Sequence, residues 1–177
     1  MQTFEDFNVS KYLLNGLEDM GITIPTPIQS ETYNVIRSGR NVVGIAQTGT
    51  GKTLAYSLPI LNELKYSEQK HPKVLILVPT RELAKQVADS VKSYAVHFNG
   101  AIKTVCVFGG VSVNTQMQAL RGGTDILVAT PGRLLDLISS NAIKLDKVKT
   151  LVLDEADRML SLGFTEELDA ILKLLPS

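Results

Sequence analysis

Two short polar segments carry residue types that can handle a phosphate group and its metal ion. The first, residues 46–53, reads AQTGTGKT and lies between the apolar run 42–46 and a helical pattern that begins at Thr53. Its glycines let backbone N–H groups turn toward an anion, and the start of the helix adds further N–H groups and the positive end of a dipole. A lysine in this pattern reaches the β- and γ-phosphates, while the adjacent threonine hydroxyl ligates Mg²⁺. The spacing therefore predicts a loop that binds a nucleoside triphosphate.

One position departs from the general pattern G-x-x-x-x-G-K-[ST], because Ala46 stands where the first glycine is expected. A chance turn before a surface helix is the alternative. We favour the phosphate loop because the two glycines, the lysine and the threonine keep their order between an expected strand and an expected helix. The expected nucleotide contacts are Ala46, Gln47, Thr48, Gly49, Thr50, Gly51, Lys52 and Thr53.

The second polar segment follows the apolar stretch 150–153 and begins with Asp154 and Glu155. An aspartate at the end of such a strand can hold Mg²⁺, directly or through water, opposite Thr53. Glu155 can orient and deprotonate an attacking water. A solvated acidic turn would explain these carboxylates if they stood alone. Because a phosphate loop occurs in the same chain, we favour a metal ligand and a catalytic base, with Lys52 as the third catalytic group.

The composition fits one domain with an apolar core. The chain has 177 residues, of which 44% are hydrophobic, and its 18 basic and 18 acidic side chains give a formal net charge of zero. That balance excludes a histone-like polycation but leaves room for a local basic face that binds nucleic acid. The single cysteine, Cys106, excludes a disulfide framework and a cysteine-based zinc site. Since the N-terminus lacks a signal-peptide pattern and no apolar run approaches ~20 residues, we expect a cytoplasmic protein that does not enter a membrane.

Strand-like and helix-like segments alternate along the chain. Continuous apolar runs predict strands at residues 41–46, 74–78, 103–108, 125–129 and 150–153. Helical spacing predicts helices at residues 11–20, 28–37, 53–64, 82–94 and 113–120, one that follows residue 133 and ends near 139, and a last one at 166–174. Ser10 is the expected cap of the first helix. The alternation predicts an α/β fold, a mostly parallel sheet with helices on both faces.

Polar residues gather where several of these strands end. They are Pro79, Thr80 and Arg81 after one strand, Gly109 and Gly110 after another, and Thr130, Pro131, Gly132 and Arg133 after a third. The carboxyl ends of parallel strands share one edge of a sheet, so these segments are expected to converge. Hydroxyls, backbone N–H groups and arginines at such corners suit the phosphates and sugars of a nucleic acid. Helix caps and surface arginines are the alternative for any one segment taken singly.

Two residues near the N-terminus have the chemistry to contact a nucleotide base. The amide of Gln29 offers a donor and an acceptor that match the N6 and N7 edge of adenine. From the pattern alone we favour the alternative, in which a glutamine at a helix start hydrogen-bonds the backbone. Phe4 can stack on a base, but a core residue is the simpler interpretation.

Together these segments resemble the motifs of the DEAD-box RNA helicases, in the order of that family. Phe4 and GITIPTPIQ match the Q motif, AQTGTGKT matches motif I, and PTRELA matches motif Ia. The glycine pair matches the GG segment, TPGR matches motif Ib, and residues 154–157 match motif II. The resemblance covers residues 4 to about 163. Alanine at the position of Ala46 is typical of this family. It implies a RecA-like P-loop NTPase fold and the ATP-binding half of an ATP-dependent RNA helicase.

The resemblance also implies a role for each matching residue. Gln29 would recognise adenine with Phe4 beside the base, and residues 49–53 would bind the triphosphate. Asp154 would serve Mg²⁺ together with Thr53. The RNA backbone would be contacted by Pro79, Thr80, Arg81, Gly109, Gly110, Thr130, Pro131, Gly132 and Arg133. The implied cofactors are ATP or ADP with Mg²⁺, and the implied partner is RNA bound without sequence preference.

Glu155 would position the attacking water, and Asp157 would couple this domain to motif III. The Ser-Ala-Thr of motif III does not occur before Ser177. We therefore expect the amino-terminal half of a longer enzyme, whose second RecA-like domain completes the ATP site. Residues 1–39 would form the Q-motif region with flanking helices, and residues 40–177 the ATP-binding domain.

Two other functions compete with this interpretation. A P-loop phosphotransferase would need an acceptor pocket or a lid, and no segment of the chain suggests one. A nucleotide- or RNA-binding module without turnover is the alternative for residues 1–177 in isolation, because an arginine from a second domain can be worth ~10³ to 10⁵ in rate.

Overall fold

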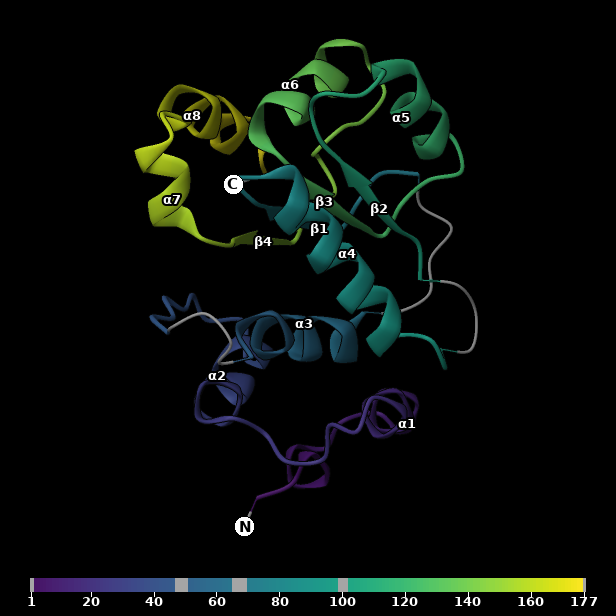
Figure 1. The fold of residues 1–177 in the computed structure, drawn as a ribbon, viewed down its shortest axis with the longest axis vertical. Coiled ribbons are helices and arrows are strands. Elements are labelled where there is room, and N and C mark those ends of the chain that lie inside the picture. The colour runs from purple at the N-terminus through teal and green to yellow at the C-terminus, as the bar shows by residue number, and fades with distance from the viewer. Residues whose placement is uncertain (1, 47–50, 65–69, 99–101, 177) are drawn as a thin grey trace. The chain divides into compact units, whose positions relative to one another are not determined.

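The computed structural model describes residues 2–46, 51–64, 70–98 and 102–176 (Figure 1). The chain forms two compact units. The helical unit comprises Met1–Tyr66 with Asp89–Ala101, and the sheet unit comprises Ser67–Ala88 with Ile102–Ser177. Helix α4 (Arg81–Tyr94) contributes residues to both. The expected boundary between residues 39 and 40 stays a prediction.

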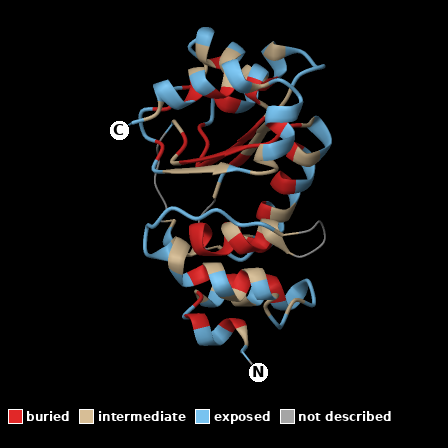
Figure 2. Ribbon diagram, turned by 90° about the vertical axis from the view of Figure 1, so that its left-hand side faces the viewer, coloured by how far each residue is buried: buried red, intermediate tan, exposed pale blue. Residues whose placement is uncertain are grey.

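The sheet unit is built on four parallel strands in the order β2-β3-β1-β4. They are β1 (Val74–Leu77), β2 (Thr104–Val107), β3 (Ile126–Ala129) and β4 (Thr150–Leu153). The central strands, VLIL and ILVA, are buried along their whole length, whereas the edge strand β4 is only partly buried (Figure 2). Continuous runs of leucine and β-branched residues suit strands that are covered on both faces.

The four strands end level with one another. The last residues of neighbouring strands stand opposite each other in the order Val107, Ala129, Leu77 and Leu153. One more backbone hydrogen bond extends each pairing, from Thr130 N–H to Val107 O (3.1 Å), from Val78 N–H to Ala129 O (3.0 Å) and from Asp154 N–H to Leu77 O (3.0 Å). The residues that follow the strands therefore form a row along the carboxyl edge of the sheet, where ligands bind in open α/β sheets.

Four helices share an apolar core with this sheet. They are α5 (Val113–Leu120), α6 (Pro131–Ser139), α7 (Ala156–Ser161) and α8 (Thr165–Leu174). Their inward side chains join those of the strands in one buried cluster that includes Leu75, Leu127, Leu134, Met159 and Ile171. Leu134 and Leu137, three residues apart on α6, are both fully buried, as helical periodicity requires. Truncating either leucine to alanine is expected to cost about 2–5 kcal/mol.

The helical unit packs three α-helices and a short 3₁₀-helix around their apolar faces. These elements are η1 (Phe4–Phe7), α1 (Lys11–Asp19), α2 (Pro27–Arg37) and α3 (Lys52–Glu63). Leu13 and Leu17, one turn apart on α1, are buried. Between them Gly16 lies against the backbone of Tyr94, so that a Cβ built on Gly16 would stand 2.6 Å from Tyr94 O. Glycine is thus required where α1 meets the end of α4.

Side chains of α1 and the residue before it bind the end of α3. The backbone N–H and the hydroxyl of Ser10 both donate to Asn62 Oδ1, at 2.7 and 2.8 Å. Tyr12 donates its hydroxyl to Leu61 O at 3.0 Å, and burial raises the pKa of Tyr12 to about 12. Ser10 is the N-cap residue of α1, as predicted, but its hydroxyl makes no capping hydrogen bond and is used in this tertiary contact instead.

The α/β class is confirmed, and the remaining predicted strands and helices occur with small differences at their ends. The strand predicted at residues 41–46 was wrong. Val43 and Ile45 are 91% and 93% exposed, and no backbone hydrogen bond joins residues 41–46 to another segment among the described residues. An apolar run without a neighbouring strand to hydrogen-bond has no reason to stay extended. Helices η1 and α7 were not predicted.

Candidate functional site

Gln29 joins the start of α2 to the end of the expected phosphate loop. The residue is only 6% exposed. Its Oε1 accepts a hydrogen bond from Thr26 N–H at 2.9 Å, and its Nε2 donates to Gly51 O at 3.1 Å. The structure therefore shows the backbone contacts that the sequence pattern favoured, and it brings the Q-motif glutamine to the phosphate loop. Adenine recognition by Gln29 stays a prediction.

Gly51 has a conformation and surroundings that only glycine tolerates. Its φ of 82° is left-handed, and it is the residue immediately before α3. A Cβ at this position would overlap Gln29 Nε2 and would lie 3.2 Å from Thr26 Oγ1. Gly51 O also accepts from Ala55 N–H at 3.0 Å, the first hydrogen bond of the helix. The backbone thus passes close to Gln29 and turns directly into the helix, as a phosphate cradle requires.

The remaining nucleotide residues divide into those inside and those outside the described part of the chain. Lys52 and Thr53 form the first turn of α3 and are partly buried. Ala46 is partly buried as well. Gln47, Thr48, Gly49 and Thr50 lie outside the described residues.

Phe4 lies in the interior of the helical unit. Its side chain is 3% exposed, and Phe7, at the other end of η1, is 6% exposed. The Phe7 ring contacts the Tyr33 ring at a centroid distance of 5.2 Å, so the 3₁₀-helix packs on α2. In this arrangement Phe4 is a core residue, which was the simpler of its two interpretations.

The acidic segment follows β4 at the edge of the sheet. Asp154 is partly buried, and its N–H extends the pairing of β4 with β1. Glu155 has φ 54° and ψ 49°, a left-handed conformation, and stands immediately before α7. A non-glycine residue in this region costs about 1–2 kcal/mol, which the surrounding structure has to supply. Asp157 is exposed in the first turn of α7.

Side chains that follow β1 reach the corner after β2, although β3 lies between the two strands. Arg81 Cζ lies 5.9 Å from the centroid of the Phe108 ring, and Lys85 Nζ lies 5.2 Å from it. A Cβ on Gly110, whose φ is 83°, would be 3.8 Å from Arg81 Nη1. The aromatic ring therefore holds two cations next to the exposed glycine pair. Thr80 acts as a helix cap, because its Oγ1 accepts from Leu83 N–H at 3.2 Å.

Arg133 is bound by protein groups. Its Nη1 donates to Gln116 Oε1 at 2.9 Å and its Nη2 to Val111 O at 3.0 Å, while Nε lies 3.5 Å from Asp136 Oδ2. Only 11% of the Arg133 side chain is exposed. The buried amide of Gln116 in turn donates to Phe108 O at 3.0 Å. Arg133 thus connects α6 to the segment that contains the glycine pair.

The rest of the segment before α6 is arranged as a helix start. Thr130 is the residue before the helix, with extended backbone, and Pro131 takes the first helical position, where its missing N–H is harmless. Pro131 is buried and Gly132 is exposed. Pro79 is buried at the end of β1. The proline residues therefore shape these two corners, while Thr130 and Gly132 remain accessible.

Sequence reasoning missed three residues of this surface. Phe108 directly precedes the glycine pair, and Lys85 follows Arg81 by four residues, so both lie next to expected site residues. Phe108 and Lys85 could have been predicted from their spacing to these residues. Gln116 could not, because nothing in the local sequence marks a glutamine inside a short helix as part of a site.

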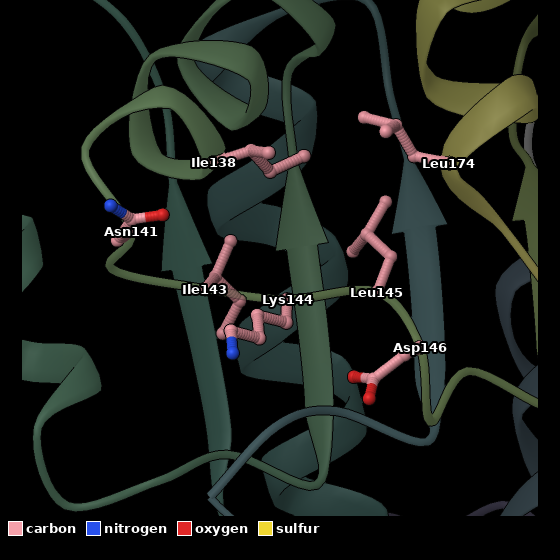
Figure 3. A pocket seen from close by; sticks show the side chains of 7 residues that line it. All are labelled: Ile138, Asn141, Ile143, Lys144, Leu145, Asp146 and Leu174. Carbon is pink, nitrogen blue, oxygen red and sulfur yellow. The ribbon is translucent and has the colours of Figure 1, made fainter.

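One further hollow lies away from all these segments. It has a volume of about 260 Å³ and is lined by Ile138, Asn141, Ile143, Lys144, Leu145, Asp146 and Leu174 (Figure 3). None of the expected site residues lines it. Within the described ranges, no three His, Cys, Asp or Glu side chains form a group suited to a metal ion. No helix in that part of the chain has the length and apolar character needed to cross a membrane.

Comparison with known proteins identifies the family. A DEAD/DEAH box helicase model matches residues 26–177. The chain is 45% identical over 174 residues to the ATP-dependent RNA helicase DeaD of Escherichia coli K12, covering 98% of this chain and 27% of that protein. It is 45% identical over 172 residues to the chloroplastic DEAD-box ATP-dependent RNA helicase 3A of Zea mays, covering 93% and 23%.

A third relative is the DEAD-box ATP-dependent RNA helicase CshA of Bacillus subtilis, 40% identical over 175 residues, with 99% of this chain and 35% of that protein covered. The chain therefore spans between about a quarter and a third of the length of these relatives. The family model covers most of the chain, including Gln29, Gly51 and the acidic segment. The chain belongs to the DEAD/DEAH box helicase family.

Proposed function

We propose that the chain is the ATP-binding part of an ATP-dependent RNA helicase. The observation that carries the proposal is the hydrogen bond from Gln29 to Gly51, which joins the expected base-reading residue to the expected phosphate loop. Two segments 22 positions apart in the sequence meet there. The relatives, which are named ATP-dependent RNA helicases, contain the same domain.

Gln29 retains the hydrogen-bonding capacity that adenine would need. A glutamine amide has two N–H donors and two lone pairs on its oxygen. Within the described residues, one donor is used on Gly51 and one lone pair on Thr26. A second donor and a second lone pair are not used by the described residues, and these would pair with the N7 and N6 edge of the base. Structural and recognition roles of Gln29 are therefore compatible.

The triphosphate would be bound by residues 46–53, with Lys52 on the β- and γ-phosphates. The donor set for Mg²⁺ fits, because Thr53 and Asp154 offer the hydroxyl and carboxylate oxygens that this ion prefers. When bound, Mg²⁺ would neutralise developing charge on the phosphate oxygens. Glu155 would deprotonate the attacking water.

RNA would lie along the carboxyl edge of the sheet. Arg81 and Lys85 supply positive charge next to the exposed glycine pair, and a chain with zero net charge has to concentrate its cations in this way to bind phosphates. Backbone N–H groups, hydroxyls and cations contact phosphates and sugars, so binding would not depend on sequence. The proposed contacts are Pro79, Thr80, Arg81, Gly109, Gly110, Thr130, Pro131 and Gly132, and Arg133 belongs to the same surface.

Unwinding would belong to the longer protein. The chain spans 27% of the DeaD relative, and a second RecA-like domain would supply the arginines that complete the ATP site. Asp157 would couple the two domains, and the protein would work in the cytoplasm. Residues 1–177 alone would bind nucleotide and RNA with little or no turnover.

ATP hydrolysis measured with and without RNA, on the full-length protein and on residues 1–177, tests this proposal. We expect RNA to stimulate hydrolysis by the full-length protein and hydrolysis by residues 1–177 to be slow. A full-length protein whose hydrolysis does not respond to RNA would contradict the proposal. Phosphate transfer to a small-molecule acceptor would favour the phosphotransferase instead.

A further inference from the structure

We propose that Arg133 is a positioning residue that acts on RNA through the protein: together with Gln116 it clamps the glycine pair of residues 109–110 in the shape that binds phosphate. The inference rests on the proposed RNA-binding function and changes the role that the family resemblance gives to this arginine. Its basis is the set of contacts that Arg133 makes within the sheet unit.

The guanidinium of Arg133 has little surface left for a ligand. Three of its nitrogen atoms face protein oxygens, on Gln116, Val111 and Asp136. With 11% of the side chain exposed, little of the guanidinium is accessible to a phosphate in this arrangement. Arg81, by contrast, is exposed and lies over an aromatic ring at the same edge of the sheet.

The contacts of Arg133 converge on the two residues that flank the glycine pair. Val111 O, on one side of the pair, accepts directly from Arg133 at 3.0 Å. Phe108 O, on the other side, accepts from Gln116 at 3.0 Å, and Gln116 is fixed by Arg133 at 2.9 Å. Both carbonyl groups next to the pair are therefore held by one connected set of side chains.

The glycine pair needs such a clamp. Glycine has the largest conformational freedom of any residue, and Gly110 has a left-handed φ of 83°. Gly109 and Gly110 are both exposed, and neither makes a hydrogen bond within the described residues. Their N–H groups are consequently available to an anion, but only an external restraint keeps them in one orientation.

The clamp also sets the position of the positive charge. Phe108, whose carbonyl is held by Gln116, carries Arg81 and Lys85 on its ring. A shift of Phe108 would therefore move two cations away from the glycine pair. Arg133 thus positions both the backbone N–H groups of the glycine pair and the charged side chains of Arg81 and Lys85.

Lysine substitution separates this role from direct contact. Arg133→Lys keeps the charge but lacks the planar fork that bridges two acceptors. In the full-length protein we expect Arg133→Lys to weaken binding of single-stranded RNA about tenfold, the scale of a lost charge-assisted hydrogen bond. The slope of log affinity against log salt should fall as well, because Phe108 then positions Arg81 and Lys85 less firmly beside the glycine pair. If Arg133 only contacted phosphate directly, lysine would keep the charge and the slope would be unchanged. Wild-type affinity in Arg133→Lys would overturn the proposal.

Gln116→Met tests the same clamp at a residue that is 6% exposed and so is shielded from RNA. It should also weaken binding, and adding it to Arg133→Lys should cost little more, since both act on one contact set. Arg121→Gln is the matched control, because Arg121 is an exposed arginine at the end of α5 outside these contacts. Equal effects of Arg121→Gln and Arg133→Lys would contradict a specific role.

Backbone order parameters from ¹⁵N NMR, measured without RNA, decide the matter independently of RNA binding. The amides of Gly109 and Gly110 should have lower order parameters in Arg133→Lys than in wild type, while those of the four strands keep their wild-type values. Unchanged order parameters at the glycine pair would overturn the clamp. Lower order parameters in Arg133→Lys, together with a wild-type protein that binds no RNA, would retain the clamp and remove the proposed function, so the two failures are distinguishable.

Discussion

The side-chain amide of Gln29 and the backbone carbonyl of Gly51 are 3.1 Å apart and hydrogen-bonded, and Gly51 has no side chain because one would occupy the place of that amide. The contact gives Gln29 a fixed orientation beside the phosphate loop. A fixed amide discriminates between bases better than a mobile one, because the wrong base leaves buried polar groups unpaired.

Removal of this amide should therefore change base selectivity more than phosphate binding. We expect ADP to bind about tenfold more tightly than GDP, and Gln29→Ala to erase most of that difference. Gln118→Ala, at an exposed glutamine of α5, should leave it intact. Calorimetry with both nucleotides measures the ratio. Equal affinities in the wild type would exclude base recognition by Gln29.

Substitutions of the two carboxylates after β4, Asp154 and Glu155, should have different kinetic effects. In the full-length protein, Glu155→Gln should bind ATP and lose hydrolysis, since the base is gone and the oxygen ligands remain. Asp154→Asn should shift the Mg²⁺ concentration required, and Lys52→Ala should lower nucleotide affinity. Steady-state rates at several Mg²⁺ concentrations separate these effects, with Glu166→Gln on the exposed side of α8 as control. A Glu155→Gln enzyme with a near wild-type rate would rule out this base.

Salt dependence should reveal which cations touch phosphate. Arg81→Gln and Lys85→Gln should each weaken RNA binding to a similar extent for all sequences, and each should reduce the slope of log affinity against log salt by ~0.7. The reason is that both cations lie over the Phe108 ring next to exposed backbone. Titrations at several salt concentrations provide the slopes. Tight binding to one sequence alone would contradict backbone recognition.

Gly16 should tolerate no side chain. A Cβ would lie 2.6 Å from Tyr94 O, a backbone atom that cannot rotate away. We expect Gly16→Ala to lower the free energy of unfolding by about 1–3 kcal/mol, despite the better helix propensity of alanine. Gly122→Ala is the control, because a Cβ there meets nothing within 4 Å. Chemical denaturation of both variants gives the comparison, and an unchanged Gly16→Ala midpoint would refute the packing argument.

His71 should make stability fall in mild acid. Its Nδ1 accepts from Lys144 N–H at 3.2 Å, which only the neutral ring can do, and burial lowers the pKa of His71 against a smaller opposing effect of Asp146. A lowered folded-state pKa contributes stability that is present above the unfolded value near 6.5 and is lost as the pH falls through the folded value.

His71→Asn keeps a side-chain acceptor and removes the titration. Its melting temperature should therefore drop less than that of the wild type when the pH is lowered from about 7.5 to about 5, the range in which histidine changes charge. Parallel drops in the two proteins would show that His71 is not responsible.

The elements that could be predicted are those whose signal is local. Strand β1 reads VLIL and is buried throughout, and α5 starts and ends at the predicted residues Val113 and Leu120. Composition and periodicity were sufficient to predict them, and β1 has β3 and β4 as the neighbours that its hydrogen bonds require. The run 42–46 looks equally apolar, yet a strand exists only if another strand receives its hydrogen bonds.

In the candidate site, too, features with a local sequence signal could be predicted, and contacts with distant residues could not. The resemblance implied that Gln29 and the phosphate loop bind one nucleotide, and Gln29 is hydrogen-bonded to Gly51. The strand pattern predicted that the polar corners converge, and Arg81 lies near Gly110. The hydrogen bonds of the Ser10 and Arg133 side chains could not be predicted. Ser10 binds Asn62, which is distant in the sequence, and Arg133 binds Gln116, which belongs to no motif. Helix α7 was missed because its six residues are too few for a periodic pattern.

The level ends of the strands set a length scale for communication within the sheet unit. Phe108 follows one edge strand and Asp154 the other, three strand spacings apart, or ~14 Å. That separation exceeds the Debye length of ~8 Å at physiological ionic strength. A phosphate held by the glycine pair and the acidic segment therefore barely sense each other's charge through solvent. Within the sheet unit, the direct connection between these two corners is therefore mechanical, through the backbone of β3 and β1 that lies between them.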